Sequence, residues 1–364
     1  MAGNGKVQVQ VLIDSLTAGG NVYRAGDVRM VSKDHPLATM ARDGTRLGPT
    51  KQLAARLLTT ESRKRSGPAA EHARAVMVQR KKGGYGDVLM TSVAVRALRQ
   101  SAPEAWITYA VPEKYGDSQV NNPDASEVVI WNGDERDRPE AEYDQTFDLT
   151  TVDAEYEAAA SPAVRKSRID LYLEMVGCST DLKVPFYKVE PEEAKAAQSL
   201  VGDGTRLRIG VEPRSNSLLR DVPPDTMAQA AAHLAREMDA EIWVLDHAMD
   251  VPFPVPNARR ACGLKFREAA AVMAKMDACI VLDSGLLHLA AALGVRSVAL
   301  FGPTDPRCRV TTYPGILPVW GVTRCIDAPC WNQIECQHRK CLDFPAEDIY
   351  WAVRRILSDA GRAD

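Results

Sequence analysis

The chain has 364 residues, of which 45% are hydrophobic, so it can bury a sizeable core in two or three domains. Its 45 basic and 48 acidic side chains leave a net charge of −3, which argues against a general nucleic-acid coat protein. No apolar run approaches a transmembrane helix, no signal peptide is visible, and eight cysteines are too few for a disulfide scaffold. We therefore expect a protein of the reducing cytoplasm.

Residues 1–58 predict a small, mainly β unit. Val7, Val9 and Val11 alternate with glutamines, which is the period of a strand. Glycine-containing turns separate further short strands, and we expect a helix near 51–60 to end the unit. This rhythm resembles short modules at the start of phage structural proteins. The resemblance implies a bacterial or phage-infected cell and a protein partner bound through residues 1–58.

Residues 59–74 are polar, contain Gly-Pro and a basic run, and predict a linker. A solvated tether and a segment that docks on an acidic surface both remain open. Residues 134–157 hold ten acidic side chains against two arginines. We expect a solvated loop there, with binding of a basic substrate as the alternative.

From residue 75 the pattern becomes strand–helix–strand, which predicts parallel sheets. In the first half, strands are expected over 75–78, 106–111 and 128–131, with a helix over 87–100. In the second half, strands are expected over 207–211, 241–245, 278–282 and 297–301, with helices over 224–238, 266–275, 286–293 and 346–358. The chain thus predicts an α/β fold with Rossmann-like domains over 75–195 and 196–345. The helix of the segment 346–364 could cross back onto the first domain.

A glycine-rich turn, Lys81-Lys82-Gly83-Gly84-Tyr85-Gly86-Asp87, lies between the first strand and the first helix. Glycines allow a close backbone approach to a ligand, and a helix N-terminus favours anions. The turn is not a dinucleotide fingerprint, because Leu89 replaces the third glycine, and it is not a P-loop. Asp87 either caps the helix or presents a carboxylate to a ligand.

A second turn, Asp283-Ser284-Gly285-Leu286-Leu287-His288, also follows a strand and opens a helix. Its backbone N–H groups could hold a phosphate, although a capped helix with a satisfied histidine is the simpler interpretation. A third turn, with Gly302 and Thr304, follows the last expected strand. Open α/β sheets bind ligands at that edge.

The stretches 74–111 and 261–306 resemble the lipopolysaccharide heptosyltransferases of glycosyltransferase family 9. The segments DSGLLHLAAALGV and ALFGPTDP carry the resemblance most specifically, and the likeness extends over roughly 75–358. It implies the GT-B fold, in which two Rossmann-like domains face each other. The donor would bind the C-terminal domain and the acceptor the N-terminal one.

The resemblance also implies roles for individual residues. Asp87 matches the family's catalytic carboxylate, which takes a proton from the acceptor hydroxyl as its oxygen attacks the anomeric carbon. Arg220 stands where the family usually has a lysine, and its forked guanidinium can hold a diphosphate. The expected donor-binding residues are Arg214, Ser215, Arg220, Asp283, Ser284, Gly285, His288, Gly302 and Thr304. Gly84, Tyr85 and Gly86 form the expected acceptor-side loop.

The function that follows is an inverting glycosyltransferase that uses a nucleoside-diphosphate sugar. ADP-heptose is the first candidate donor, a glycan or protein hydroxyl is the acceptor, and no cofactor is required for the chemistry. The alternative is a non-catalytic nucleotide- or sugar-binding module of a phage-type assembly. An NAD-dependent oxidoreductase is disfavoured because neither half carries the glycine fingerprint.

Four cysteines fall within 17 residues in the loop 325–341, with His338 between them: Cys325, Cys330, Cys336 and Cys341. Thiolate clusters bind zinc or iron, but the spacing lacks the CxxC pairs of zinc ribbons. A related subgroup that glycosylates autotransporter proteins has a four-cysteine iron site, so the resemblance implies a structural iron or zinc here. Free thiols and disulfides remain open.

Overall fold

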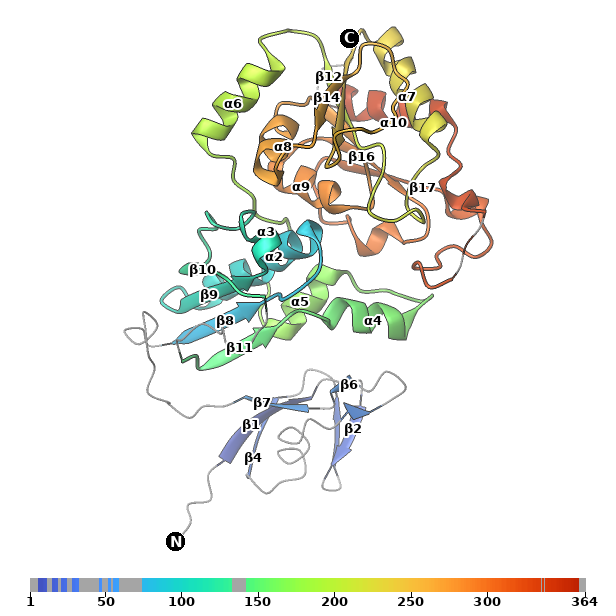
Figure 1. The fold of residues 1–364 in the computed structure, drawn as a ribbon. Helices are drawn as coiled ribbons and strands as arrows, with labels where there is room; N and C mark the ends of the chain where they lie inside the picture. Colours follow the sequence, from blue (N-terminus) through green and yellow to red (C-terminus); the bar gives the residue numbers. More distant parts are fainter. Residues whose placement is uncertain are drawn as a thin grey trace.

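The computed structural model describes residues 74–132, 142–334, 336 and 338–359, together with the backbone of short strands between residues 6 and 58 (Figure 1). Two parallel sheets flanked by helices form the larger part of the described chain, and the short N-terminal strands form separate antiparallel ladders. No helix in these described ranges is both long and apolar enough to cross a membrane.

The N-terminal strands confirm the expected β character of this unit. β1 (Lys6–Val11) pairs antiparallel with both β4 (Val28–Ser32) and β7 (Ala55–Leu58). Two small ladders join β2 (Ser15–Ala18) to β3 (Asn21–Arg24) and β5 (Arg46–Leu47) to β6 (Gln52–Leu53). The helix expected near 51–60 is wrong, because strand pairing with β1 overrides the helix preference of that alanine- and leucine-rich stretch. The predicted linker falls on residues 59–73, which lie outside the described residues.

The first sheet has the order β10–β9–β8–β11, and all its ladders are parallel. Its strands are β8 (Ala75–Gln79), β9 (Trp106–Val111), β10 (Glu127–Ile130) and β11 (Gln145–Asp148). Its helices are α2 (Tyr85–Ser101), α3 (Glu113–Gly116), α4 (Val152–Ala160) and α5 (Arg168–Val176). β8 is buried along its whole length, as a central parallel strand should be.

The described part of the acidic stretch 134–157, which begins at residue 142, is not the solvated loop that we expected. It contains β11 and most of α4, and two of its acidic residues are buried, Asp153 and Glu157. Carboxylates are buried only when they are paired, so charge counting alone cannot identify them as solvated. Their partners are arginines from distant parts of the sequence.

The second sheet has the order β14–β13–β12–β15–β16–β17, again parallel throughout. Its strands are β12 (Arg208–Val211), β13 (Glu241–Asp246), β14 (Arg259–Cys262), β15 (Ala278–Leu282), β16 (Ser297–Phe301) and β17 (Ile316–Trp320). Its helices are α7 (Pro224–Glu237), α8 (Phe266–Met273), α9 (Gly285–Leu293) and α10 (Ala346–Ser358). Taken in chain order, this is the 3-2-1-4-5-6 order of a dinucleotide-binding fold. Sequence analysis missed β14 and β17.

Two boundary expectations are corrected. The predicted domain boundary at 195/196 falls inside α6 (Pro191–Val201), which packs on α8 of the second domain. The C-terminal helix α10 does not pack on the first domain. It lies instead against α7 and the strands β15, β16 and β17, and its apolar side joins the second core.

Candidate active site

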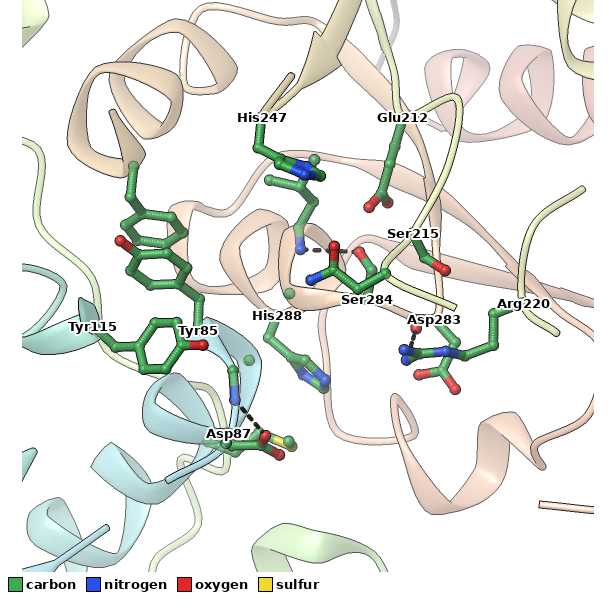
Figure 2. A pocket seen from close by; sticks show the side chains of 18 of the residues that line it. Tyr85, Asp87, Tyr115, Glu212, Ser215, Arg220, His247, Asp283, Ser284 and His288 are labelled. Carbon is green, nitrogen blue, oxygen red and sulfur yellow. Dashed lines mark hydrogen bonds between the residues drawn. The ribbon is translucent and has the colours of Figure 1, made fainter. Parts of the chain in front are cut away.

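The carboxyl ends of the strands of both sheets lie at one cleft. Ligands bind open parallel sheets where the strand order reverses, at the carboxyl ends of the strands. That point lies between β8 and β11 in the first sheet and between β12 and β15 in the second. Residues that follow β8, β12 and β15 line a single cleft of about 840 Å³, a volume suited to a ligand of nucleotide-sugar size (Figure 2).

Asp87 enters the cleft from the first domain. It is the third residue of α2, and its Oδ2 accepts a 2.8 Å hydrogen bond from the backbone N–H of Gly84. Its Oδ1 lies 2.6 Å from Nη1 of Arg168 and 3.5 Å from Nη2 of Arg80. A carboxylate has about four lone-pair sites, so these contacts leave each oxygen able to accept a further proton donor. Asp87 therefore caps its helix and also presents a carboxylate to the cleft.

An arginine–carboxylate network fixes Asp87 in place. Arg168 donates to both oxygens of Glu157, at 2.7 and 2.9 Å, and Arg80 lies 2.7 Å from Asp153. Burial works against the charge of Arg168, but Glu157, Asp153 and Asp87 raise its pKa well above the ordinary value. Arg168 thus stays a cation beside Asp87. No local sequence pattern points to Arg168, because it lies 81 residues from Asp87 in the chain.

The network continues into the second domain through Arg309. Its Nη2 lies 2.9 Å from Glu157 of the first domain, and its Nε lies 3.8 Å from Asp283. Thr304 donates a 2.7 Å hydrogen bond to Asp283. Although burial opposes it, Arg309 and then Arg220 hold the pKa of Asp283 below its ordinary value. A continuous series of ion pairs therefore links Asp87 to the turn that contains Asp283.

The start of α9 packs against the start of α2 at the cleft. Ser284 is the N-cap of α9 and accepts from the backbone N–H of Leu286 at 3.1 Å. A Cβ on Gly86 would lie 2.8 Å from Cδ2 of His288 and 3.3 Å from Cα of Gly285, so glycine is needed where the helices meet. His288 is buried, its ring contacts the Tyr313 hydroxyl at 2.8 Å, and burial lowers its pKa to about 4.

The loop after β12 supplies the other donor-side residues. Arg220 donates to the backbone carbonyl of Asp283, while its Nε is buried without a partner among the described residues. Ser215 hydrogen-bonds Asp221 at 2.7 Å. Arg214 is already paired with Asp246 at 2.9 Å, so its charge is matched within the protein. Arg220 is the arginine best placed for a diphosphate.

Glu212, which sequence analysis did not single out, directly follows β12 and lines the cleft. It accepts a 2.8 Å hydrogen bond from the Leu282 N–H and a further one from the Ser284 hydroxyl. Complete burial raises its pKa to about 8, so the carboxyl is mostly protonated at neutral pH. It therefore acts as a neutral support for the turn that begins α9.

An aromatic wall closes the end of the cleft where the domains meet. The ring of Tyr85 stacks on Phe266 at 3.6 Å between centroids, and Tyr115 meets Tyr85 edge-on at 4.8 Å (Figure 2). Tyr85 was expected, but Phe266 and Tyr115 were missed, since their own sequence surroundings read as ordinary helix starts. The stack joins the two domains beside α2.

The structure brings most of the predicted residues together. Those that line the cleft are Gly84, Tyr85, Gly86, Asp87, Arg214, Ser215, Arg220, Asp283, Ser284, Gly285, His288 and Thr304. Gly302 is not among the residues that line it. A Cβ there would lie 2.6 Å from Leu342 and 2.9 Å from Sγ of Cys341, so this glycine makes room for the end of the cysteine-rich loop.

Among the described residues, the cysteine-rich loop brings one group of ligand atoms to within 4.8 Å of one another, from Cys325, Asp327 and His338. Cys330, Cys336 and Cys341 are not part of that group, so the expected four-cysteine set is not assembled in the structure. Burial, together with the neighbouring Cys325, Cys330 and Cys336, raises the pKa of Cys341 to about 11. All eight cysteines are free thiols. Thiolate, carboxylate and imidazole groups all bind zinc or iron, so the group at Cys325 fits such a metal.

The fold and cleft define a class: two Rossmann-like domains that face each other, the GT-B arrangement. Residues 253–322 match the model of glycosyltransferase family 9 (heptosyltransferase). Over 95 residues the chain is 37% identical to lipopolysaccharide heptosyltransferase 1 of Pseudomonas aeruginosa. That match covers 25% of this chain and 24% of the relative, so it spans about a quarter of each. The second domain thus carries the sequence signature of the family, as its motifs predicted.

Solved structures show the same fold over a longer range. A family 9 glycosyltransferase from Veillonella parvula superposes with a TM-score of 0.64 and 18% identity, covering 79% of this chain and 98% of its own. The iron-containing dodecameric glycosyltransferase TibC from enterotoxigenic E. coli H10407 has a TM-score of 0.63 and 12% identity. It covers 97% of this chain and 93% of its own. The likeness to TibC therefore extends into the N-terminal strands, whereas no comparison supports the resemblance to phage modules.

Proposed function

We propose that this chain is an inverting glycosyltransferase that moves a sugar from a nucleoside-diphosphate donor to a hydroxyl acceptor. One observation carries the proposal. Asp87, with lone pairs still free, lines the same cleft as the N-terminus of α9 and Arg220. A proton acceptor and an anion-binding helix end in one cleft are what glycosyl transfer requires.

In the proposed reaction, Asp87 takes the proton of the acceptor hydroxyl as that oxygen attacks the anomeric carbon. The bond from the anomeric carbon to the diphosphate breaks on the opposite face, so the configuration inverts. The leaving diphosphate gains negative charge. The Arg220 guanidinium and the N–H groups at the start of α9 stabilise it there.

ADP-heptose is the first candidate donor. A solved structure of TibC is a complex with ADP-D-beta-D-heptose. In the present chain, the part of the cleft at β13 and β14 is partly apolar and suits a nucleobase, with Leu245, Ala261 and Leu264 among its lining residues. We expect the acceptor to be a glycan or protein hydroxyl, bound beside Gly84, Tyr85 and Gly86.

The cysteine-rich loop is proposed to hold a structural metal through Cys325, Cys330, Cys336 and Cys341. Iron or zinc bound there would brace the loop and supply no step of the transfer. Metal analysis of the purified protein should find about one such ion per chain. Cys336→Ser should lose it, while Cys178→Ser, outside the loop, should keep it. Absence of bound metal in protein purified without chelators would refute this part of the proposal.

A donor panel tests the proposed function. We would measure binding of ADP, GDP, UDP, dTDP, CDP and NAD by thermal shift, then assay release of the bound diphosphate from the matching sugar donors. A ligand at 100 times its Kd should add about 2.7 kcal/mol of stability. We expect a response to one diphosphate, with turnover of its sugar. Binding without turnover for any sugar and acceptor would favour the non-catalytic module instead, and a response to NAD alone would contradict both.

A further inference from the structure

Trp331 carries a polar group that the proposed reaction has not used. Its side chain lies in the cysteine-rich loop, is 3% exposed and lines the cleft. Its indole Nε1–H is buried without a hydrogen-bond partner among the described residues. A buried donor of this kind costs free energy unless a ligand or water satisfies it.

Contacts to the donor-side domain hold Trp331 firmly. Its backbone N–H donates a 2.9 Å hydrogen bond to the carbonyl of Pro303, and the Arg309 guanidinium lies 4.9 Å from its ring centroid. Trp331 and Asn332 both have positive φ angles, 53° and 60°, which are unfavourable for residues with side chains. The loop therefore adopts an unfavourable backbone conformation at the two residues that it places at the cleft.

The position of Trp331 suits the sugar of the donor better than its nucleobase or its diphosphate. Arg309, which covers its ring, also contacts Glu157 and lies near Asp283, so Trp331 is on the Asp87 side of the cleft. The proposed nucleobase end lies at β13 and β14. An indole N–H is a neutral donor without any acceptor, which suits a hydroxyl better than a diphosphate.

We propose that the indole N–H of Trp331 donates a hydrogen bond to a hydroxyl of the sugar being transferred. Trp331 is then a specificity residue for the glycosyl part of the donor, delivered by the cysteine-rich loop. This inference rests on the proposed function, because it needs a donor sugar in the cleft. It also gives the loop a task at the active site, since Cys330 directly precedes Trp331.

The test compares Trp331→Phe, which keeps a ring and removes the N–H, with Trp351→Phe at an exposed position. Calorimetry would measure Kd for the nucleoside diphosphate alone and for the intact sugar donor. We expect Trp331→Phe to weaken donor binding about tenfold, the loss of one hydrogen bond, and to leave diphosphate binding unchanged. Trp351→Phe should leave both unchanged.

Donor analogues that lack one sugar hydroxyl each make the test independent of small folding effects. One analogue should bind wild type and Trp331→Phe equally, because the contacted hydroxyl is missing from both complexes. Equal losses for the diphosphate and the donor, a rise only in acceptor KM, or a constant Trp331→Phe penalty across all analogues would each overturn the inference. If wild-type protein binds no diphosphate and turns over no donor, the proposed function itself fails.

Discussion

The two strand–turn–helix units that meet at the cleft look alike in sequence but use their aspartates differently. In the first unit, β8 leads to α2 and Asp87 is the third residue of the helix. In the second, β15 leads to α9 and Asp283 precedes the N-cap Ser284. That difference of a few positions decides whether the carboxylate faces a ligand or the protein.

Asp283 is turned back towards the sheet edge, where Thr304 donates to it and Arg309 and Arg220 lower its pKa. Its side chain is 8% exposed, whereas that of Asp87 is 17% exposed. Asp87 keeps unused lone pairs beside the cleft. This contrast supports the proposal that Asp87 serves chemistry and that Asp283 mainly holds its own turn together, which separate substitutions can test.

The largest effect should come from Asp87→Asn. Because the amide cannot take the acceptor proton, we expect kcat to fall about 10²- to 10⁴-fold. Diphosphate Kd should stay within about twofold, since the donor-side contacts are untouched. Steady-state kinetics and calorimetry on the same preparation check both points. A variant that retains wild-type kcat would show that Asp87 is not the base.

Asp283→Asn should instead reduce stability. The substitution takes a buried anion from Arg220 and leaves Arg309 with Glu157 alone, and removing one partner from a buried charge pair costs about 3–5 kcal/mol. Asp87→Asn should cost less, since Arg168 keeps Glu157 and Asp153. Urea unfolding of both variants measures the difference. Equal losses of unfolding free energy would erase the distinction between the two aspartates.

The comparison of the two units also shows which parts of the candidate site could be predicted from the sequence. Local patterns located both glycine turns, the strands before them and Asp87 itself, because those signals lie within about ten residues. The network around Asp87 could not be predicted, since Arg168 and Arg309 meet Glu157 only after the domains have folded and faced each other. Gly302 was assigned to the donor from its strand-end position and the family resemblance, whereas in the structure it makes room for Leu342 and Cys341.

Gly86→Ala should disturb the contact between the two units. Its Cβ would lie 2.8 Å from His288 and must push α2 and α9 apart, an overpacking that costs about 1–3 kcal/mol. We expect a lower Tm and a kcat/KM reduced roughly tenfold. Gly204→Ala is the matched control, because its Cβ would meet only a side-chain nitrogen at 3.8 Å. A Gly86→Ala variant as stable and active as that control would mean that the helices do not meet this closely.

The smallest effect concerns Glu212, which supports the second unit through Leu282 and Ser284. Burial raises its pKa from 4.5 to about 8, so between these pH values the folded chain keeps a proton that the unfolded chain loses. Stability should therefore decline as pH rises across this window, by at most ~1.4 kcal/mol per pH unit from this group.

Glu212→Gln keeps a neutral hydrogen-bonding group and should remove that part of the decline. Urea unfolding of both proteins at pH 5.5, 6.5 and 8 measures the two slopes. His288, whose pKa burial lowers to about 4, contributes in the opposite sense and below pH 6.5, so the comparison between pH 6.5 and 8 isolates the carboxyl. Parallel slopes there would show that Glu212 is ionised in the folded protein, and the turn at Ser284 would then need another neutral support.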